Sequence, residues 1–216
     1  MKAAPKPAPR APRLPGRSRF AAILLMLISA GVGIYAADEV LLLSHPEAVA
    51  KADTVAVGGL DPASVHKFNQ VLFGSLHAMA DSRAFVLSAL AIASALAFVA
   101  AGRLLRPAGV SRESVRRLLA GSALTAAVLR TIDGAQMAVA YHRAVGAVAD
   151  GFLKVATQPG MTPPVGMKEW LAPASAAGVL IWTQILVGVF LFTAQHFRSK
   201  PVREFIAASD ALTSQR

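Results

Sequence analysis

The segment "AFVLSALAIASALAFVAAG", residues 84–102, contains 19 residues and no charged side chain. As an α-helix it would be about 30 Å long, which is the thickness of the hydrocarbon core of a bilayer. Arg83 precedes this segment, and Arg103 and Arg106 follow it. Because lipid offers no hydrogen-bond partner to the backbone, a segment of this kind must be helical.

Three further apolar segments share this character, at about residues 20–43, 118–140 and 171–195. The chain is 55% hydrophobic and only 16% charged, whereas soluble domains carry about one quarter charged residues. We therefore predict an all-α integral membrane protein, with a four-helix transmembrane bundle over residues 20–197.

The first apolar segment follows a basic stretch, as the apolar part of a signal peptide does. Tyr35 would occupy the third position before a cut after Ala37, where a small residue is required. A cut after Gly33, which would place Gly31 at that position, matches the pattern only weakly. We interpret the segment as a retained membrane anchor.

Residues 1–19 contain five prolines and six Lys or Arg residues, with no acid. That composition predicts a disordered tail, and residues 198–216 are expected to form a second tail. Residues 103–117 carry five Lys or Arg and residues 198–216 carry four, against three in each of residues 44–83 and 141–170. The positive-inside rule then places both termini in the cytoplasm.

An amphipathic helix is expected over residues 62–80, between the first two spans. Asp61 can cap its first turn and Pro62 suits the first helical position. The apolar residues at helical spacing form one stripe: Val65, Phe68, Leu72, Leu76 and Met79. The stripe predicts a helix that lies against the bundle or along the outer headgroup layer.

Two opposite charges, Arg130 and Asp133, stand within the span 118–140, with Arg130 expected near mid-depth and Asp133 one turn closer to the outside. Gln136 shares the face of Asp133, and this polar stripe must look into the bundle. Gln184 lies near the midpoint of the span 171–195, and we expect it to face the stripe.

The charge pair has three interpretations. An unpaired charge at mid-depth costs about 2.5–3.5 kcal/mol, which favours a structural clamp in which Arg130 and Asp133 neutralise each other. A small transporter or channel could instead use the pair as an ion, proton or ligand path, although Ser88 and Ser94 are the only polar groups in the span 84–102. In the third interpretation the span sits lower, which leaves Asp133 at the interface.

The sequence predicts no catalytic residue, no metal site and no cofactor. It has no cysteine and five histidines, and it contains no zinc, phosphate-loop or nucleophile motif. His77 and His142 fall near the outer ends of their helices, so a b-type haem held between them is an alternative hypothesis. The net charge of +10 sits beside apolar segments, which indicates lipid headgroups and no nucleic acid.

The leading functional hypothesis is a non-enzymatic multi-pass membrane protein: an accessory or scaffold subunit that packs against a membrane-protein partner or against copies of itself. The Ala-rich composition and short loops suggest a bacterial inner membrane. The transporter and haem hypotheses remain as alternatives.

Overall fold

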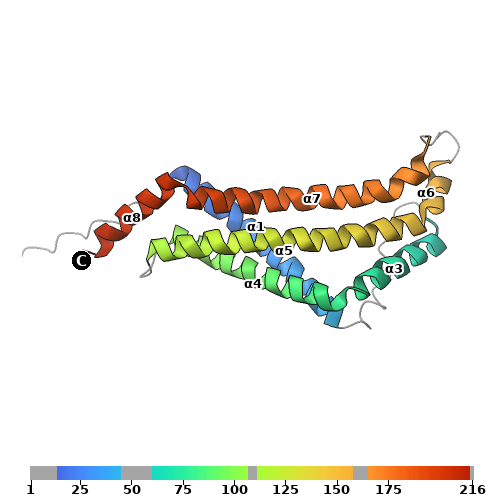
Figure 1. Cartoon of the computed structure of the whole chain (residues 1–216), viewed down its shortest axis with the longest axis horizontal. Coiled ribbons are helices and arrows are strands. Elements are labelled where there is room, and N and C mark those ends of the chain that lie inside the picture. Colours follow the sequence, from blue (N-terminus) through green and yellow to red (C-terminus); the bar gives the residue numbers. More distant parts are fainter. Residues whose placement is uncertain (1–13, 45–59, 107–110, 158–164, 215–216) are drawn as a thin grey trace, which may run out of the picture.

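The computed structural model describes residues 14–44, 60–106, 111–157 and 165–214. These residues are almost entirely helical, with no strand among them (Figure 1). In chain order the helices are α1 (Gly16–Ser44), α3 (Pro62–His77), α4 (Ala80–Leu105), α5 (Arg112–Ala147), α6 (Ala149–Ala156), α7 (Met167–Arg198) and α8 (Lys200–Ser214). Four of them, α1, α4, α5 and α7, are long and apolar enough to cross a membrane. The predicted all-α membrane bundle is confirmed.

Each predicted span lies inside one helix, but the helices are longer than the spans. Residues 16–19 belong to α1, so the prediction of a disordered tail over residues 1–19 is wrong for these residues. Residues 1–13 lie outside the described part of the chain. The segment 198–216, expected as a simple tail, contains the helix α8.

Small side chains allow α1 and α4 to pack closely. Ala22 and Leu25 on α1 are fully buried, as are Leu87 and Leu90 on α4. At Gly33 an added Cβ would lie 3.3 Å from the Cβ of Ser94, so the two backbones approach closely at that level. Close approach of this kind replaces the hydrophobic effect as the source of attraction between helices in lipid.

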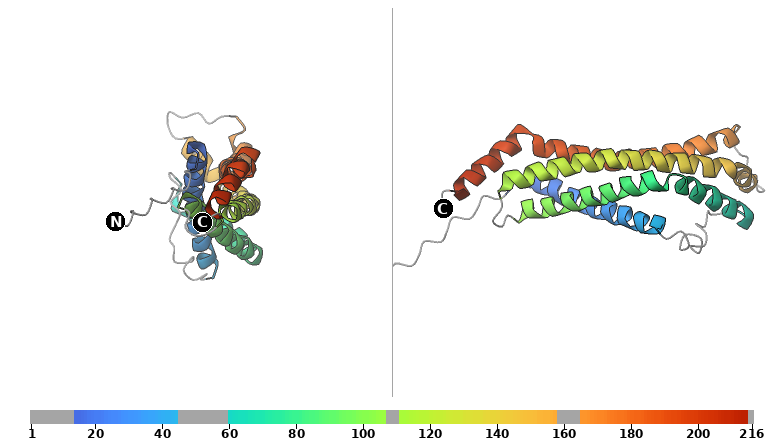
Figure 2. Two further views of the ribbon diagram at one scale, coloured as in Figure 1. Left: turned by 90° about the vertical axis from the view of Figure 1, so that its left-hand side faces the viewer. Right: turned by 60° about the horizontal axis from the view of Figure 1, so that its bottom comes forward.

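The helix α5 lies at the centre of the fold, between α4 and α7 (Figures 1 and 2). Its buried face is built from alanines, among them Ala123, Ala126 and Ala127. Phe190 and Phe197 of α7 fill the space beside them and are fully buried. The 36 residues of α5 make it about 54 Å long, which exceeds the thickness of a bilayer core.

The second half of α5 and the first half of α7 continue past the start of α4, where α3 packs against α5 (Figure 1). We call this region the distal arm: α3, residues 134–147 of α5, α6, and residues 167–182 of α7. It has an apolar cluster of its own, formed by Phe68, Leu72, Leu76, Ala140, Ala144, Val145 and Val148. The predicted amphipathic helix is thus confirmed, and four residues of its stripe are buried against the bundle: Val65, Phe68, Leu72 and Leu76. The helix ends at His77 and not at residue 80, and Met79 lies in the turn before α4.

The start of α3 forms as its sequence predicts. Asp61 is the N-cap residue, and its carboxylate accepts hydrogen bonds from the Ser64 amide at 3.0 Å and the Ser64 hydroxyl at 2.8 Å. These hydrogen bonds stabilise the charged form and hold the pKa of the Asp61 carboxyl below its usual value. Pro62 occupies the first turn, where a missing amide hydrogen carries no cost.

At the opposite end of the molecule, α8 bends away from the line of α7 and contacts the first turn of α5 (Figure 1). Val202 and Ile206 of α8 join the main apolar core. The Asp210 carboxylate accepts hydrogen bonds from the backbone amides of Arg112 and Glu113, at 3.1 and 3.0 Å. A residue from α8 therefore caps α5, so the two helices hold each other in place.

Candidate functional site

Arg83, at the start of α4, is the centre of a buried charge cluster. Its side chain is fully buried. One terminal nitrogen, Nη1, donates to Asp133 Oδ1 of α5 at 2.8 Å. The other, Nη2, donates to Glu39 Oε2 and to the Tyr35 hydroxyl of α1, both at 3.1 Å. One guanidinium thus joins three of the four long helices.

The predicted Arg130–Asp133 pair forms within this cluster. Nη1 of Arg130 donates to Asp133 Oδ2, the carboxylate oxygen that Arg83 leaves free. The Arg130 guanidinium also lies 5.0 Å from the centre of the Tyr35 ring, within the range of a cation–π contact. We call Tyr35, Glu39, Arg83, Arg130 and Asp133 the buried ion network.

The buried ion network is electrically balanced, with two guanidinium groups and two carboxylates. The exposed fraction is 0% for the side chains of Arg83 and Asp133, 10% for Arg130 and 25% for Glu39. Removing one member of such a buried set leaves a charge without a counter-ion, which costs about 3–5 kcal/mol. The need to pair each charge with a counter-ion therefore determines which residues of α1, α4 and α5 lie side by side.

The hydrogen-bond partners of Asp133 bear on the chemical role of the buried ion network. Each of its carboxylate oxygens accepts a hydrogen bond from a different arginine. The two arginines come from different helices, so Asp133 links α4 to α5. This geometry favours the interpretation of the pair as a clamp between helices.

The partner of Asp133 bears on the depth at which the network lies. Arg83 immediately precedes the uncharged segment 84–102 of α4, so Asp133 lies level with one end of that segment. This contact favours the interpretation in which the membrane-spanning part of α5 sits lower and leaves Asp133 at the interface, over the one that places Arg130 near mid-depth.

The two glutamines expected in the polar stripe behave differently. Gln136 is partly buried, and its Nε2 lies 3.5 Å from the Ser82 hydroxyl, beside Arg83. Gln184 is exposed on α7, so the expectation that it faces the stripe is wrong.

The buried residue at that level of α7 is Thr183, one position earlier. It packs against Gly134 so closely that a Cβ added there would lie 2.8 Å from the Thr183 Cβ. A rotation of one residue, about 100°, separates the expected face from the observed one.

Tyr35, Glu39 and Arg83 are the functional candidates that the sequence analysis did not identify as site residues. Tyr35 and Glu39 are four residues apart on α1 and thus share a face. Arg83 marks the end of an apolar segment, where an arginine is usually expected to reach for water. No local pattern indicated that its partner would be Asp133, 50 residues away.

The two histidines of the haem hypothesis are both exposed, His77 at the end of α3 and His142 on α5. Haem held between helices needs ligands that converge in an enclosed cavity, so the exposure of these side chains gives the hypothesis no support. Among the described residues, no group of three or more His, Asp or Glu side chains could hold a metal ion.

No protein-family model matches the chain, and no curated protein and no solved structure match it. The fold alone therefore defines its class: an integral membrane protein with four helices of transmembrane length.

Proposed function

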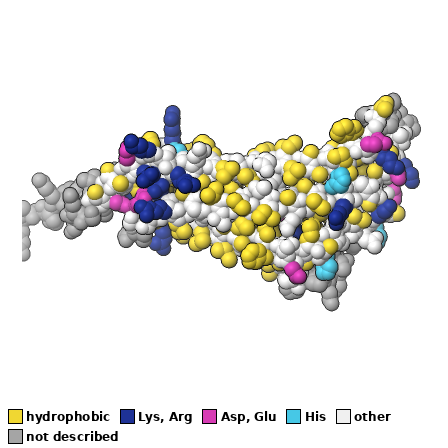
Figure 3. Space-filling view, viewed as in Figure 1, with side chains coloured by type: hydrophobic (Ala, Val, Ile, Leu, Met, Phe, Trp, Pro, Cys, Tyr) yellow, Lys and Arg dark blue, Asp and Glu magenta, His cyan; other side chains and the backbone are white. Residues whose placement is uncertain are grey.

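We propose that this chain is a non-enzymatic multi-pass protein of a bacterial inner membrane, with both termini in the cytoplasm. Its role is that of an accessory or scaffold subunit, which the buried ion network holds rigid and which packs against a membrane partner through the distal arm. The excess of Lys and Arg in residues 1–19, 103–117 and 198–216 supports this orientation. In Figure 3 charged side chains gather at the two ends, and apolar side chains cover the middle.

The distal arm carries charges that favour water over lipid. Lys67 on α3 is exposed, as are His142 and Arg143 on α5. Lys168 of α7 forms an ion pair of 2.6 Å with Asp150 of α6. Exposed lysine and arginine side chains are costly in hydrocarbon, which supports a position for the arm beyond the bilayer core.

The apolar side of α7 within this arm is the observation that carries the proposal. Trp170, Ile181 and Trp182 are 70%, 64% and 59% exposed, although they stand at or beyond the level of the buried ion network. The uncharged part of α7, residues 170–195, is also longer than the uncharged segment 84–102 of α4. A large apolar surface beyond the lipid core is typical of a protein–protein contact.

Photo-crosslinking in native membranes tests this proposal. A photoreactive amino acid replaces Ile181 on the arm or, as a matched control, Ile92 on the lipid-facing side of α4. These isoleucines are 64% and 62% exposed. We expect a discrete protein adduct from position 181 and only lipid adducts from position 92. The adduct mass distinguishes a second copy of the chain from a different protein.

A substitution on the arm makes the test specific. With the probe at position 181, Trp182→Gln should reduce the yield of the protein adduct, because it removes apolar contact area beside the probe. Equal protein adducts from positions 181 and 92, or a lone monomer after extraction in mild detergent, would contradict the proposed role.

A further inference from the structure

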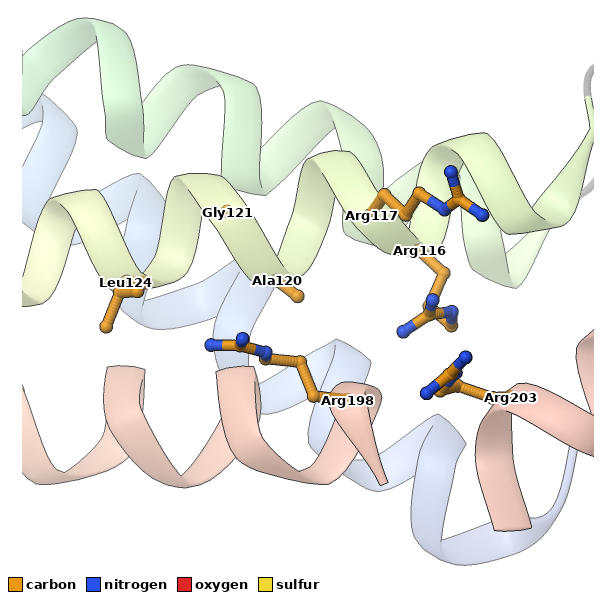
Figure 4. Close-up of a pocket in the computed structure, with 7 residues that line it drawn as sticks. All are labelled: Arg116, Arg117, Ala120, Gly121, Leu124, Arg198 and Arg203. Atoms are coloured by element: carbon orange, nitrogen blue, oxygen red, sulfur yellow. The ribbon is translucent and has the colours of Figure 1, made fainter. Parts of the chain in front are cut away.

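At the α8 end of the molecule, α5, the last turn of α7 and α8 enclose an open pocket of about 390 Å³ (Figure 4). Four arginines and three small or apolar residues line it: Arg116, Arg117, Ala120, Gly121, Leu124, Arg198 and Arg203. In Figure 4 the guanidinium groups of Arg116 and Arg203 approach each other at one end of the pocket, and the Arg198 side chain extends along it toward Ala120 and Leu124. The pocket is thus amphipathic, with a cationic end at Arg116 and Arg203 and an apolar end at Leu124 that the Arg198 guanidinium approaches.

The cationic end has more positive than negative charge. Nε and Nη2 of Arg116 both donate to the Glu113 carboxylate at 2.7 Å, and Nε of Arg117 donates to it at 2.8 Å. Arg198 and Arg203 form no ion pair within the described part of the chain. Glu113 thus pairs with Arg116 and Arg117 only, and the residues that line the pocket include four arginines and no acid. A bound anion would relieve the repulsion between these guanidinium groups.

The Arg116 side chain is held in one orientation by hydrogen bonds on both sides of its guanidinium. Its Nη1 donates to the carbonyl oxygen of Phe197, near the end of α7, at 2.6 Å, while Glu113 holds the other side of the guanidinium. Fixing this side chain before a ligand arrives lowers the entropy cost of binding. Guanidinium groups match the oxygens of phosphate in charge and in geometry.

The apolar end continues into the part of α5 that faces lipid. Nothing lies within 4 Å of a Cβ built at Gly121, so the floor of the pocket is open. Leu124 and Val128, which follow on the same face, are 39% and 55% exposed. A ligand with an anionic head and a hydrocarbon tail would match this arrangement, with its head at the arginines and its tail along Leu124 and Val128.

We propose that this pocket binds the phosphate of an anionic phospholipid, with an acyl chain over Leu124 and Val128. The pocket lies where α1 begins and α7 ends, a level at which the Ser18 hydroxyl is 3.1 Å from Nε2 of His196. This is the end of two helices of transmembrane length, where lipid phosphates would be expected. Free phosphate shares the head chemistry but would make no use of the apolar end.

Lipid binding to the purified full-length chain tests the proposal. Native mass spectrometry measures the binding of phosphatidylglycerol and of zwitterionic phosphatidylcholine. The pocket variant is Arg198→Gln with Arg203→Gln, and its matched control is Arg103→Gln with Lys200→Gln, which removes the same charge from exposed positions outside the pocket. We expect the pocket variant to bind phosphatidylglycerol about tenfold more weakly, since each lost charge-assisted hydrogen bond costs binding energy. The control should stay close to wild type.

Gly121→Leu distinguishes a bound phospholipid from free phosphate, and it tests the proposal independently of the arginine variants. The new side chain fills the apolar end, so it should weaken phosphatidylglycerol binding while leaving the arginines in place. Competition by inorganic phosphate at millimolar concentration, with no effect of Gly121→Leu, would show a free-phosphate site and overturn the proposal. Equal losses in the pocket variant and its charge-matched control would overturn it as well.

Discussion

Asp133 shows how one residue can set the register of three helices. Its two carboxylate oxygens hold Arg83 from α4 and Arg130 from its own helix, and Arg83 in turn holds Glu39 from α1. A shift of α4 by one turn would separate Arg83 from both acids and leave unpaired charges beside lipid. The network thus selects one packing arrangement, even where its net contribution to stability is small.

Gly134, the next residue along, controls how closely α7 approaches. A Cβ at this position would overlap the Thr183 side chain, and a β-branched side chain has little rotamer freedom to move away. We expect Gly134→Ala to lower the free energy of unfolding by about 1–3 kcal/mol through overpacking. Unfolding in detergent by denaturant measures this.

Gly188→Ala is the matched control for that substitution, because a Cβ at Gly188 on α7 meets nothing within 4 Å. There the change should be neutral or stabilising, since alanine favours helix by about 1 kcal/mol over glycine. If both variants behaved alike, the close contact between Gly134 and Thr183 would not limit stability.

At the scale of helices, α5 depends on a cap that arrives from another element. The Asp210 carboxylate on α8 accepts hydrogen bonds from the Ser111 hydroxyl and from two backbone amides of the first turn of α5. We expect Asp210→Ala to destabilise the protein by about 1 kcal/mol, as the loss of an N-cap does. Faster hydrogen exchange at the Arg112 and Glu113 amides should accompany the loss.

Glu204→Ala provides the control on the same helix. Glu204 is exposed and its nearest ion-pair partner, Lys200, lies 3.8 Å away, so its removal should change stability little. Hydrogen exchange that rose equally in the Asp210 and Glu204 variants would mean that α8 as a whole, and not the cap, protects α5.

Local signals in the sequence were sufficient to predict the four long helices and α3, but not the short helices α6 and α8. The uncharged segment 84–102 was recognised by its length, and the stripe from Val65 to Leu76 by its helical periodicity; both lie in helices as expected. The Arg130–Asp133 pair was also predicted, because its members are three residues apart on one helix.

Contacts between helices could not be predicted from periodicity. These contacts depend on how far each helix is shifted and rotated against its neighbour. Two examples are the pairing of Arg83 with Asp133 and the burial of Thr183 in place of Gln184. A shift of one residue turns a helix by about 100°, and the apolar segments of α5 and α7 have no sharp ends that would define their alignment. The packing of α8 on α5 was missed for the same reason, since Asp210 lies 97 residues from the amide of Glu113 that it caps.

For the whole molecule, the arrangement of a lipid-embedded bundle and a distal arm implies that the two ends lie on opposite sides of the membrane. The chain has no cysteine, so single cysteines report position without background. We expect Arg143→Cys, on the arm, to react with a membrane-impermeant maleimide in intact cells. Arg103→Cys, at the end of α4, should react only after permeabilisation. The reverse pattern would contradict the proposed orientation.

The central claim is that the buried ion network acts as a neutral clamp, and a double-mutant cycle on Arg130 and Asp133 tests it most directly. Asp133→Asn leaves two guanidinium groups with one carboxylate, and should lower the free energy of unfolding by about 3–5 kcal/mol. Adding Arg130→Gln restores neutrality between Arg83 and Glu39, so the double variant should be more stable than Asp133→Asn alone. A double variant whose loss equals or exceeds the sum of the two single losses would contradict the clamp.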